Sequence, residues 1–119
     1  MTKPREISDP IATASFVIAR ADGGRTPVVV TVGRPYVVDE AEARCPITIS
    51  GLDGPYADIG GSDTLQALGL ALSFIRRRLE HQAEQGCRLL YEGETGEEEV
   101  EVDLQALFGA SPPAEPRSA

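Results

Sequence analysis

The chain has 119 residues with 19 acidic and 11 basic side chains, and its net charge of −8 argues against general binding to nucleic-acid phosphates. This length suits a single domain, and because 41% of the residues are hydrophobic but none is tryptophan, an aliphatic core is expected. No stretch of about 18 consecutive apolar residues is present, which excludes a membrane-spanning helix.

Two strands joined by a tight turn are predicted in the first third of the chain. Residues 1–13 show no periodic pattern and are expected to form a flexible N-terminal segment. Alternating apolar residues then predict strands over residues 14–20 and 27–34. Asp22-Gly23 favours a hairpin turn between them, because glycine readily adopts a positive φ angle. Pro35, which has no amide hydrogen to donate, ends the second strand.

Shorter strands are expected in the next part of the chain. Residues 38–44 carry several carboxylates and are expected to form a polar connection, either irregular or a single turn of helix. The pattern of residues 45–50 predicts a third strand, and residues 56–59 a short fourth. Successive hairpin-like links of this kind predict a meander and therefore an antiparallel sheet.

An amphipathic helix over residues 64–85 is the best-defined element. Asp63 is suited to cap its N-terminus, with Gln66 at the position that completes a capping box, and Gly86 is suited to end it. Large aliphatic residues recur every three or four positions and make one apolar stripe: Leu65, Leu68, Leu72, Ile75 and Leu79. The stripe is widened by Ala67, Leu70, Ala71 and Phe74. A stripe this broad predicts burial against a sheet, with a loop or a second subunit along its flank.

The remaining elements complete the predicted fold. Residues 88–91 and 99–104 predict a fifth and a sixth strand, with a helical turn over 103–108 as the alternative. Residues 110–119 have the composition of a disordered tail. The sequence thus predicts a single α+β domain over residues 14–109, with a mainly antiparallel sheet of four to six strands packed against one long helix in the C-terminal half.

A run of acidic residues near the C-terminus is the first candidate site. Seven carboxylates and no basic residue lie between Glu92 and Asp103. The favoured interpretation is a solvated strand face whose charges discourage edge-to-edge aggregation, and the alternative is a surface that binds a basic partner. The candidate protein-binding residues are Glu97, Glu98, Glu99, Glu101 and Asp103.

The residue patterns favour neither catalysis nor metal binding. Gly60-Gly61 is interpreted as a structural turn, since the Asp63 carboxylate would repel a phosphate at the helix N-terminus. His81 is expected to be solvated, and Cys45 and Cys87 to be free thiols whose spacing matches no usual zinc pattern. No serine lies in a nucleophile-elbow context. No catalytic residue, cofactor or metal is therefore predicted.

Several segments resemble a small bacterial family that is described only as a domain of unknown function. These segments are Ile18-Ala19-Arg20, residues 28–35 ending in Val-Gly-Arg-Pro, Cys45-Pro-Ile-Thr-Ile, and Gly61-Ser-Asp-Thr-Leu-Gln-Ala-Leu-Gly-Leu-Ala-Leu. The resemblance covers roughly residues 15–91, and its most specific part is Ser-Asp-Thr-Leu-Gln-Ala-Leu. It implies an α+β domain with a sheet and one long helix, and it implies no activity, cofactor or catalytic residue.

The first functional hypothesis is a non-enzymatic protein-interaction module. Its partner would be a basic protein or a second copy, bound through the open sheet face or the broad helix flank. One alternative is an acidic protein of the immunity or antitoxin type that neutralises a basic toxin. The other is a small ligand-binding protein or enzyme with a pocket between the helix and the sheet. The lack of a signal-peptide pattern and the preference for arginine over lysine predict a cytoplasmic protein of a GC-rich bacterium.

Overall fold

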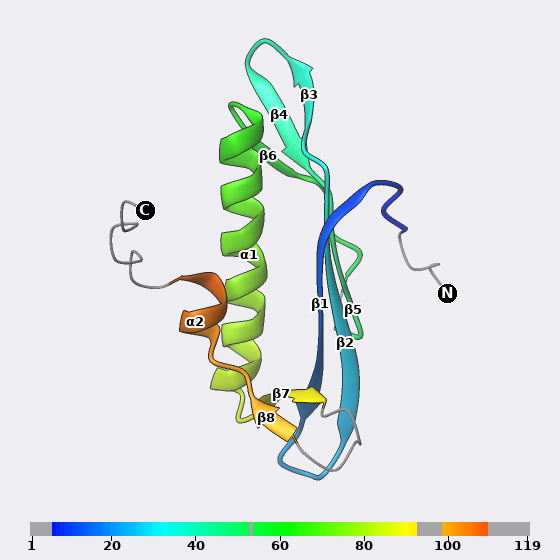
Figure 1. The fold of residues 1–119 in the computed structure, drawn as a ribbon, viewed down its shortest axis with the longest axis vertical. Helices are drawn as coiled ribbons and strands as arrows, with labels where there is room; N and C mark the ends of the chain where they lie inside the picture. The colour runs from blue at the N-terminus through cyan, green and yellow to red at the C-terminus, as the bar shows by residue number, and fades with distance from the viewer. Residues whose placement is uncertain (1–5, 53, 93–98, 110–119) are drawn as a thin grey trace, which may run out of the picture.

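The fold is that of an α+β domain, seen in a computed structural model that describes residues 6–52, 54–92 and 99–109. The long helix α1 (Thr64–Glu84) covers one face of an antiparallel sheet, which Figure 1 shows nearly edge-on. The predicted fold class is confirmed. No helix within the described ranges is both long and apolar enough to cross a membrane.

The strands of the described residues form two sheets. The larger sheet has the order β5-β2-β1-β7-β8, and its neighbouring strands are all antiparallel. Its strands are β1 (Pro10–Ala19), β2 (Arg25–Gly33), β5 (Ile47–Ser50), β7 (Arg88–Glu92) and β8 (Glu99–Glu101). The smaller sheet, β3-β4-β6, consists of β3 (Tyr36–Asp39), β4 (Glu42–Cys45) and β6 (Ile59–Gly61).

The first hairpin forms as predicted. Gly23 has a φ of 93°, and the Gly24 amide donates to Asp22 Oδ1 at 2.7 Å, which closes the turn between β1 and β2. The strand β1 begins at Pro10, earlier than the expected start at residue 14, and an irregularity near its start shifts the register between Pro10 and Ala12. This extension of β1 forms one wall of the site described below.

The prediction for residues 38–44 was wrong, because this segment forms the β3–β4 hairpin. Asp39 Oδ1 accepts the Ala41 amide at 2.8 Å and holds the turn. All of β3 is exposed, and Val37 keeps 69% of its surface accessible, so no apolar alternation marks it as a strand. The hairpin projects as an arm (Figure 1). The predicted third strand, β5, pairs with β2 as a meander requires, but the meander ends there because β6 pairs with β4 and not with β5.

The ends of α1 follow the sequence signals closely. Asp63 Oδ1 accepts the Gln66 amide at 2.7 Å, as expected of an N-cap. The Gln66 side chain reaches back to the Ser62 amide, also at 2.7 Å, one residue before the cap. At the other end, Gly86 has a φ of 87°. The fourth strand, predicted over residues 56–59, is β6 and lies slightly later in the chain. It leads directly into the start of α1.

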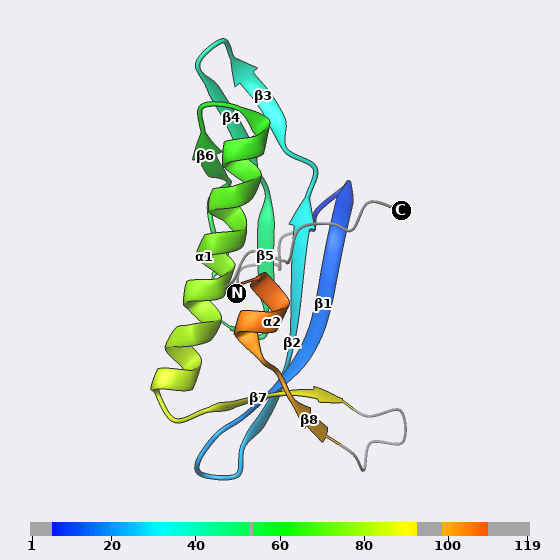
Figure 2. The same cartoon turned by 60° about the vertical axis from the view of Figure 1, so that its left-hand side comes forward.

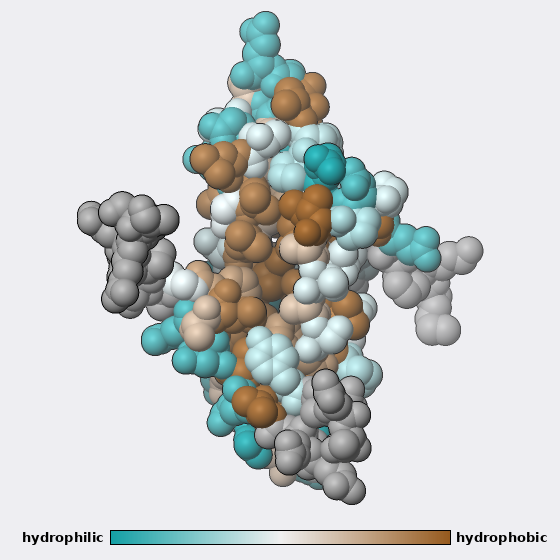
Figure 3. All heavy atoms as spheres, viewed as in Figure 1, coloured by the Kyte–Doolittle hydropathy of each residue, from teal (hydrophilic) through white to brown (hydrophobic). Residues whose placement is uncertain are grey.

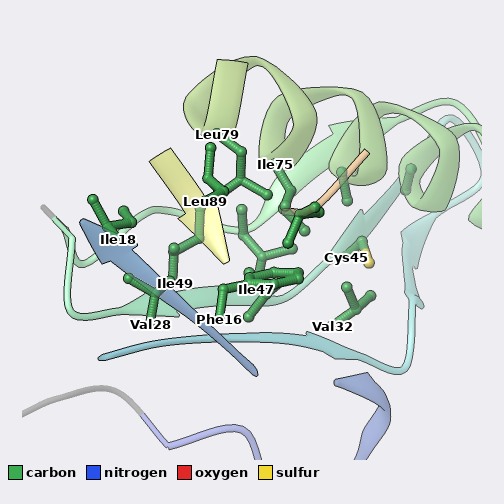
Figure 4. Packing of buried hydrophobic residues seen from close by; sticks show 14 of the residues in the cluster. Phe16, Ile18, Val28, Val32, Cys45, Ile47, Ile49, Ile75, Leu79 and Leu89 are labelled. Carbon is green, nitrogen blue, oxygen red and sulfur yellow. The ribbon is translucent and has the colours of Figure 1, made fainter. Parts of the chain in front are cut away.

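The buried face of α1 is only part of the predicted stripe. Its buried residues are Ala67, Ala71, Ile75 and Leu79. The two alanines let the helix approach β4 and β6 closely, whereas Leu65 stays 79% exposed. Figure 4 shows Ile75 and Leu79 pointing from α1 onto Phe16 and the side chains of β5.

The C-terminal part of the domain contains a second helix, α2 (Leu104–Phe108). Asp103 caps it, so the helical turn forms and the sixth strand ends at Glu101. Figure 2 shows α2 lying across the gap between α1 and β1. The predicted tail over residues 110–119 lies outside the described residues.

Candidate functional site

An apolar groove of about 280 Å³ lies between α1 and the β1 edge of the larger sheet. Its sheet side consists of Ala12, Thr13, Ala14 and Phe16 from β1, with Val30 and Val32 from β2. Its helical side consists of Leu72, Ile75 and Leu79 from α1, with Leu107 and Phe108 from α2. Figure 3 shows hydrophobic side chains gathered between α1 and β1, on the face where this groove opens.

The groove is open because, among the described residues, the edge of β1 opposite β2 has no neighbouring strand over most of its length. The strand β7 pairs with β1 only from Val17 to Ala19. Beyond that point β7 diverges from β1, and in Figure 2 its end points away from α1. No other strand of the described residues pairs with this edge of β1. The short helix α2 covers only part of this opening, so Leu72 and Leu107 stay partly exposed, whereas Phe16, Ile75 and Leu79 are buried.

The chemistry of the groove is that of a hydrophobic contact surface. No lining residue has an acidic, basic or thiol side chain. The only side-chain hydroxyl in the lining, that of Thr13, donates to the Val30 carbonyl oxygen at 3.0 Å. Such a groove can bury apolar groups, but it offers no side chain for proton transfer or nucleophilic attack.

The predicted apolar stripe of α1 continues from this groove toward the arm. Leu72 lines the groove and is 38% exposed, Leu68 is half-buried, and Leu65 lies at the start of the helix. Val37 and Val38 on β3 are exposed as well. Figure 3 shows hydrophobic side chains along α1 up to the arm. The stripe that was expected to be buried therefore has its N-terminal half on the surface.

The acidic candidate residues are only partly described. Glu97 and Glu98 lie outside the described residues, and Glu99 begins β8 opposite Glu92. Glu101 is exposed, whereas Asp103 caps α2 by accepting the amides of the second and third residues after it at 3.0 and 3.3 Å. Part of the acidic run therefore stabilises a helix end, and its role in protein binding stays a prediction.

A polar hollow of about 370 Å³ lies on the other flank of α2. Glu101 and Asp103 line it together with Arg76 and Glu80, and these last two form an ion pair at 3.3 Å. A further polar hollow lies near the base of the arm, where Arg34 pairs with Asp9 at 2.6 Å. Each hollow is lined by charged side chains that include an ion pair, whereas the apolar groove presents hydrophobic side chains that a protein partner can bury, which makes the groove the stronger candidate for binding.

The cysteines and the histidine do not come together. Cys45 is fully buried, its thiol donates to the Gly33 carbonyl oxygen at 3.5 Å, and burial raises the pKa of this thiol. Cys87 is half-buried, its Sγ lies 3.9 Å from Gln82 Oε1, and both cysteines are free. His81 is exposed on α1. In the part of the chain that the structure describes, no three histidine, cysteine or carboxylate groups are placed to hold a metal ion.

The Gly60-Gly61 turn has a packing role. A Cβ atom on Gly61 would lie 2.6 Å from the Ala67 backbone nitrogen, so only glycine allows α1 to pack this closely on β6. A pocket between the helix and the sheet was expected only under the ligand-binding or enzymatic alternative, and its lining residues were not predicted. Its signal was the mismatch between a broad apolar stripe on the helix and a sheet too narrow to cover it.

Comparison with known proteins relates the chain to a family but not to a function. A family model described as a domain of unknown function (DUF6968) matches residues 14–108. No curated protein and no solved structure matches the chain.

Proposed function

The chain belongs to the DUF6968 family, and we propose that it is a non-enzymatic protein-interaction module whose binding site is the apolar groove between α1 and β1. The observation that carries this proposal is an apolar groove along an edge of β1 that, before Val17, pairs with no other strand of the described residues. The predicted interaction module gains a defined site in this way. The expected dimer surface on the open sheet face is not needed for it.

Hydrophobic burial supplies the driving force for binding at this site. Leu72 and Leu107 are large apolar side chains that both line the groove and stay partly accessible to water. Covering apolar surface stabilises a complex by roughly 25 cal/mol per Å² before the cost of ordering the partner is subtracted. Contiguous exposed apolar surface of this kind often marks a protein-binding site.

The residues that line the groove also favour a protein-binding site over the enzymatic alternative. An enzyme site combines an apolar pocket with a few convergent polar groups. The only lining residue with a hydroxyl group is Thr13, which lies in the alternation of β1 on the face turned away from α1, and its hydroxyl already donates to a backbone carbonyl. A hydrophobic segment of a partner protein fits such a lining better than a polar metabolite does.

A charge placed in the groove is expected to abolish binding. In Leu72→Glu, a partner would have to bury an unpaired carboxylate, which reduces affinity by at least roughly tenfold. Leu70→Glu is the matched control, because Leu70 lies on the same helix, is 46% exposed and does not line the groove. The tagged variants and the wild-type protein are expressed in the host, and captured proteins are quantified by mass spectrometry.

The proposal expects at least one stoichiometric partner that Leu72→Glu loses and Leu70→Glu retains. Thermal unfolding of both variants confirms that the fold is intact. Equal capture by the wild-type protein and Leu72→Glu would rule out the groove as the binding site.

A further inference from the structure

We propose that the groove takes an extended segment of a partner protein, which adds as a strand to the free edge of β1 and points alternate apolar side chains into the groove. This inference rests on the proposed function and deepens it, because it specifies the conformation and the sequence pattern of the bound segment. Strand addition of this kind uses backbone hydrogen bonds for affinity and side-chain pockets for specificity.

The backbone of β2 shows which of its groups point toward β1. The Val30 carbonyl accepts the Thr13 hydroxyl of β1, and the Arg34 amide, in the same alternation, donates to the Asp9 carbonyl just before β1. The Gly33 amide instead donates to Pro46 on the opposite side. Even-numbered residues of β2 therefore direct their backbone groups to β1, because such groups alternate along a strand.

The register then identifies the free groups of β1. Ala14 lies opposite Val30, so Ala14 directs its amide and carbonyl to β2. Thr13 and Ser15, on either side of Ala14, direct their amide and carbonyl groups away from β2, toward the free edge of β1. Val17 also directs its backbone groups outward, and there they face β7, which pairs with β1 only from Val17 to Ala19. Thr13 and Ser15 thus offer two amides and two carbonyls to an incoming strand.

The same register fixes the sequence pattern of the bound segment. Ala12, Ala14 and Phe16 line the groove, whereas Ser15 pairs with exposed Val29 on the opposite face of the sheet. Residues directly opposite each other on neighbouring strands share a face. Partner residues opposite Ala12 and Ala14 therefore enter the groove and are apolar, whereas the ring of Tyr91, 5.4 Å from that of Phe16, already occupies the place beside Phe16. Those opposite Thr13 and Ser15 face away from the helix, and small or polar residues suit them.

A partner protein fits this edge better than a second copy of the chain. Two β1 edges paired antiparallel would each present Ala12 and Ala14 to the groove of the other copy. Their methyl groups are too small to fill about 280 Å³. Each copy also carries a net charge of −8, which opposes self-association. A partner segment with valine, leucine or phenylalanine at alternate positions fills the groove instead.

A phage library of random dodecapeptides, selected against the full-length wild-type protein, tests the proposal. The enriched peptides are expected to alternate apolar with small or polar residues. Their affinities, measured by fluorescence anisotropy, are expected to fall by at least roughly tenfold with Ser15→Pro and to stay nearly unchanged with Ser15→Ala. Proline removes the outward amide of Ser15, but it leaves the hydrogen bonds between β1 and β2 intact.

Each outcome has a distinct meaning. Peptides that lose binding with Leu72→Glu but not with Ser15→Pro would overturn strand addition while the groove remains the binding site. Peptides whose affinity is unchanged by both Leu72→Glu and Ser15→Pro would overturn the proposed function as well. Failure to enrich alternating peptides, or a wild-type dimer in light scattering that Ser15→Pro dissociates, would also overturn the proposal. If Ser15→Pro fails to fold, slower amide exchange at Thr13 and Ser15 on adding an enriched peptide supports strand addition, and unchanged exchange overturns it.

Discussion

Replacing Leu79 by alanine is expected to lower the free energy of unfolding by about 2–5 kcal/mol. Leu79 is a fully buried residue of α1, and its side chain belongs both to the main core and to the lining of the groove. Truncation loses the burial of its side chain and leaves a cavity that the surrounding strands cannot close completely. Urea unfolding followed by circular dichroism measures the change.

Leu70→Ala provides the control for this prediction, since it makes the same substitution at an exposed position of the same helix. Its effect is expected to stay within about 0.5 kcal/mol. If the two variants lost similar stability, the orientation of α1 over the sheet would be wrong.

The second large effect is expected at Gly61. In Gly61→Ala, the new methyl group would lie 2.6 Å from the Ala67 nitrogen and 2.9 Å from its Cα. Because both atoms belong to the backbone, α1 must shift away from β6, and a loss of about 1–3 kcal/mol is expected. Thermal unfolding of the purified variant measures this loss.

A glycine on the free side of α1 gives a control with the opposite sign. A methyl group on Gly69 meets no atom within 4 Å. Gly69→Ala is therefore expected to stabilise the protein by about 0.5–1 kcal/mol, because alanine loses less backbone entropy in a helix than glycine does. Stabilisation by Gly61→Ala would contradict the close contact between α1 and β6.

The elements that the sequence predicted correctly depend on local interactions. The first hairpin follows from Asp22-Gly23, whose turn geometry requires no distant contact. The helix α1 follows from Asp63 and from Gly86, which act within one turn of its ends. The arm was missed because β3 buries neither face, so it lacks the alternation that reveals a half-buried strand.

The groove was not predictable from local patterns because it results from how distant strands pair. The helix periodicity correctly grouped Leu72, Ile75 and Leu79 on one side of α1. It could not show that β7 would leave β1 after three paired residues. Beyond that departure, no second strand of the described residues covers the edge of β1, and Leu72 lines the groove 38% exposed while Leu79 is buried. The acidic run was visible in the sequence but does not line the groove.

Residue-resolved amide hydrogen exchange along β1 tests the central claim most directly. In the free protein, the amides of Ala14 and Phe16 are expected to exchange slowly, because they are bonded to β2. The amides of Thr13 and Ser15 are expected to exchange many times faster and to become protected when a partner segment binds. Slow exchange at all four amides of the free protein would contradict the account, because it would mean that the edge of β1 is already covered.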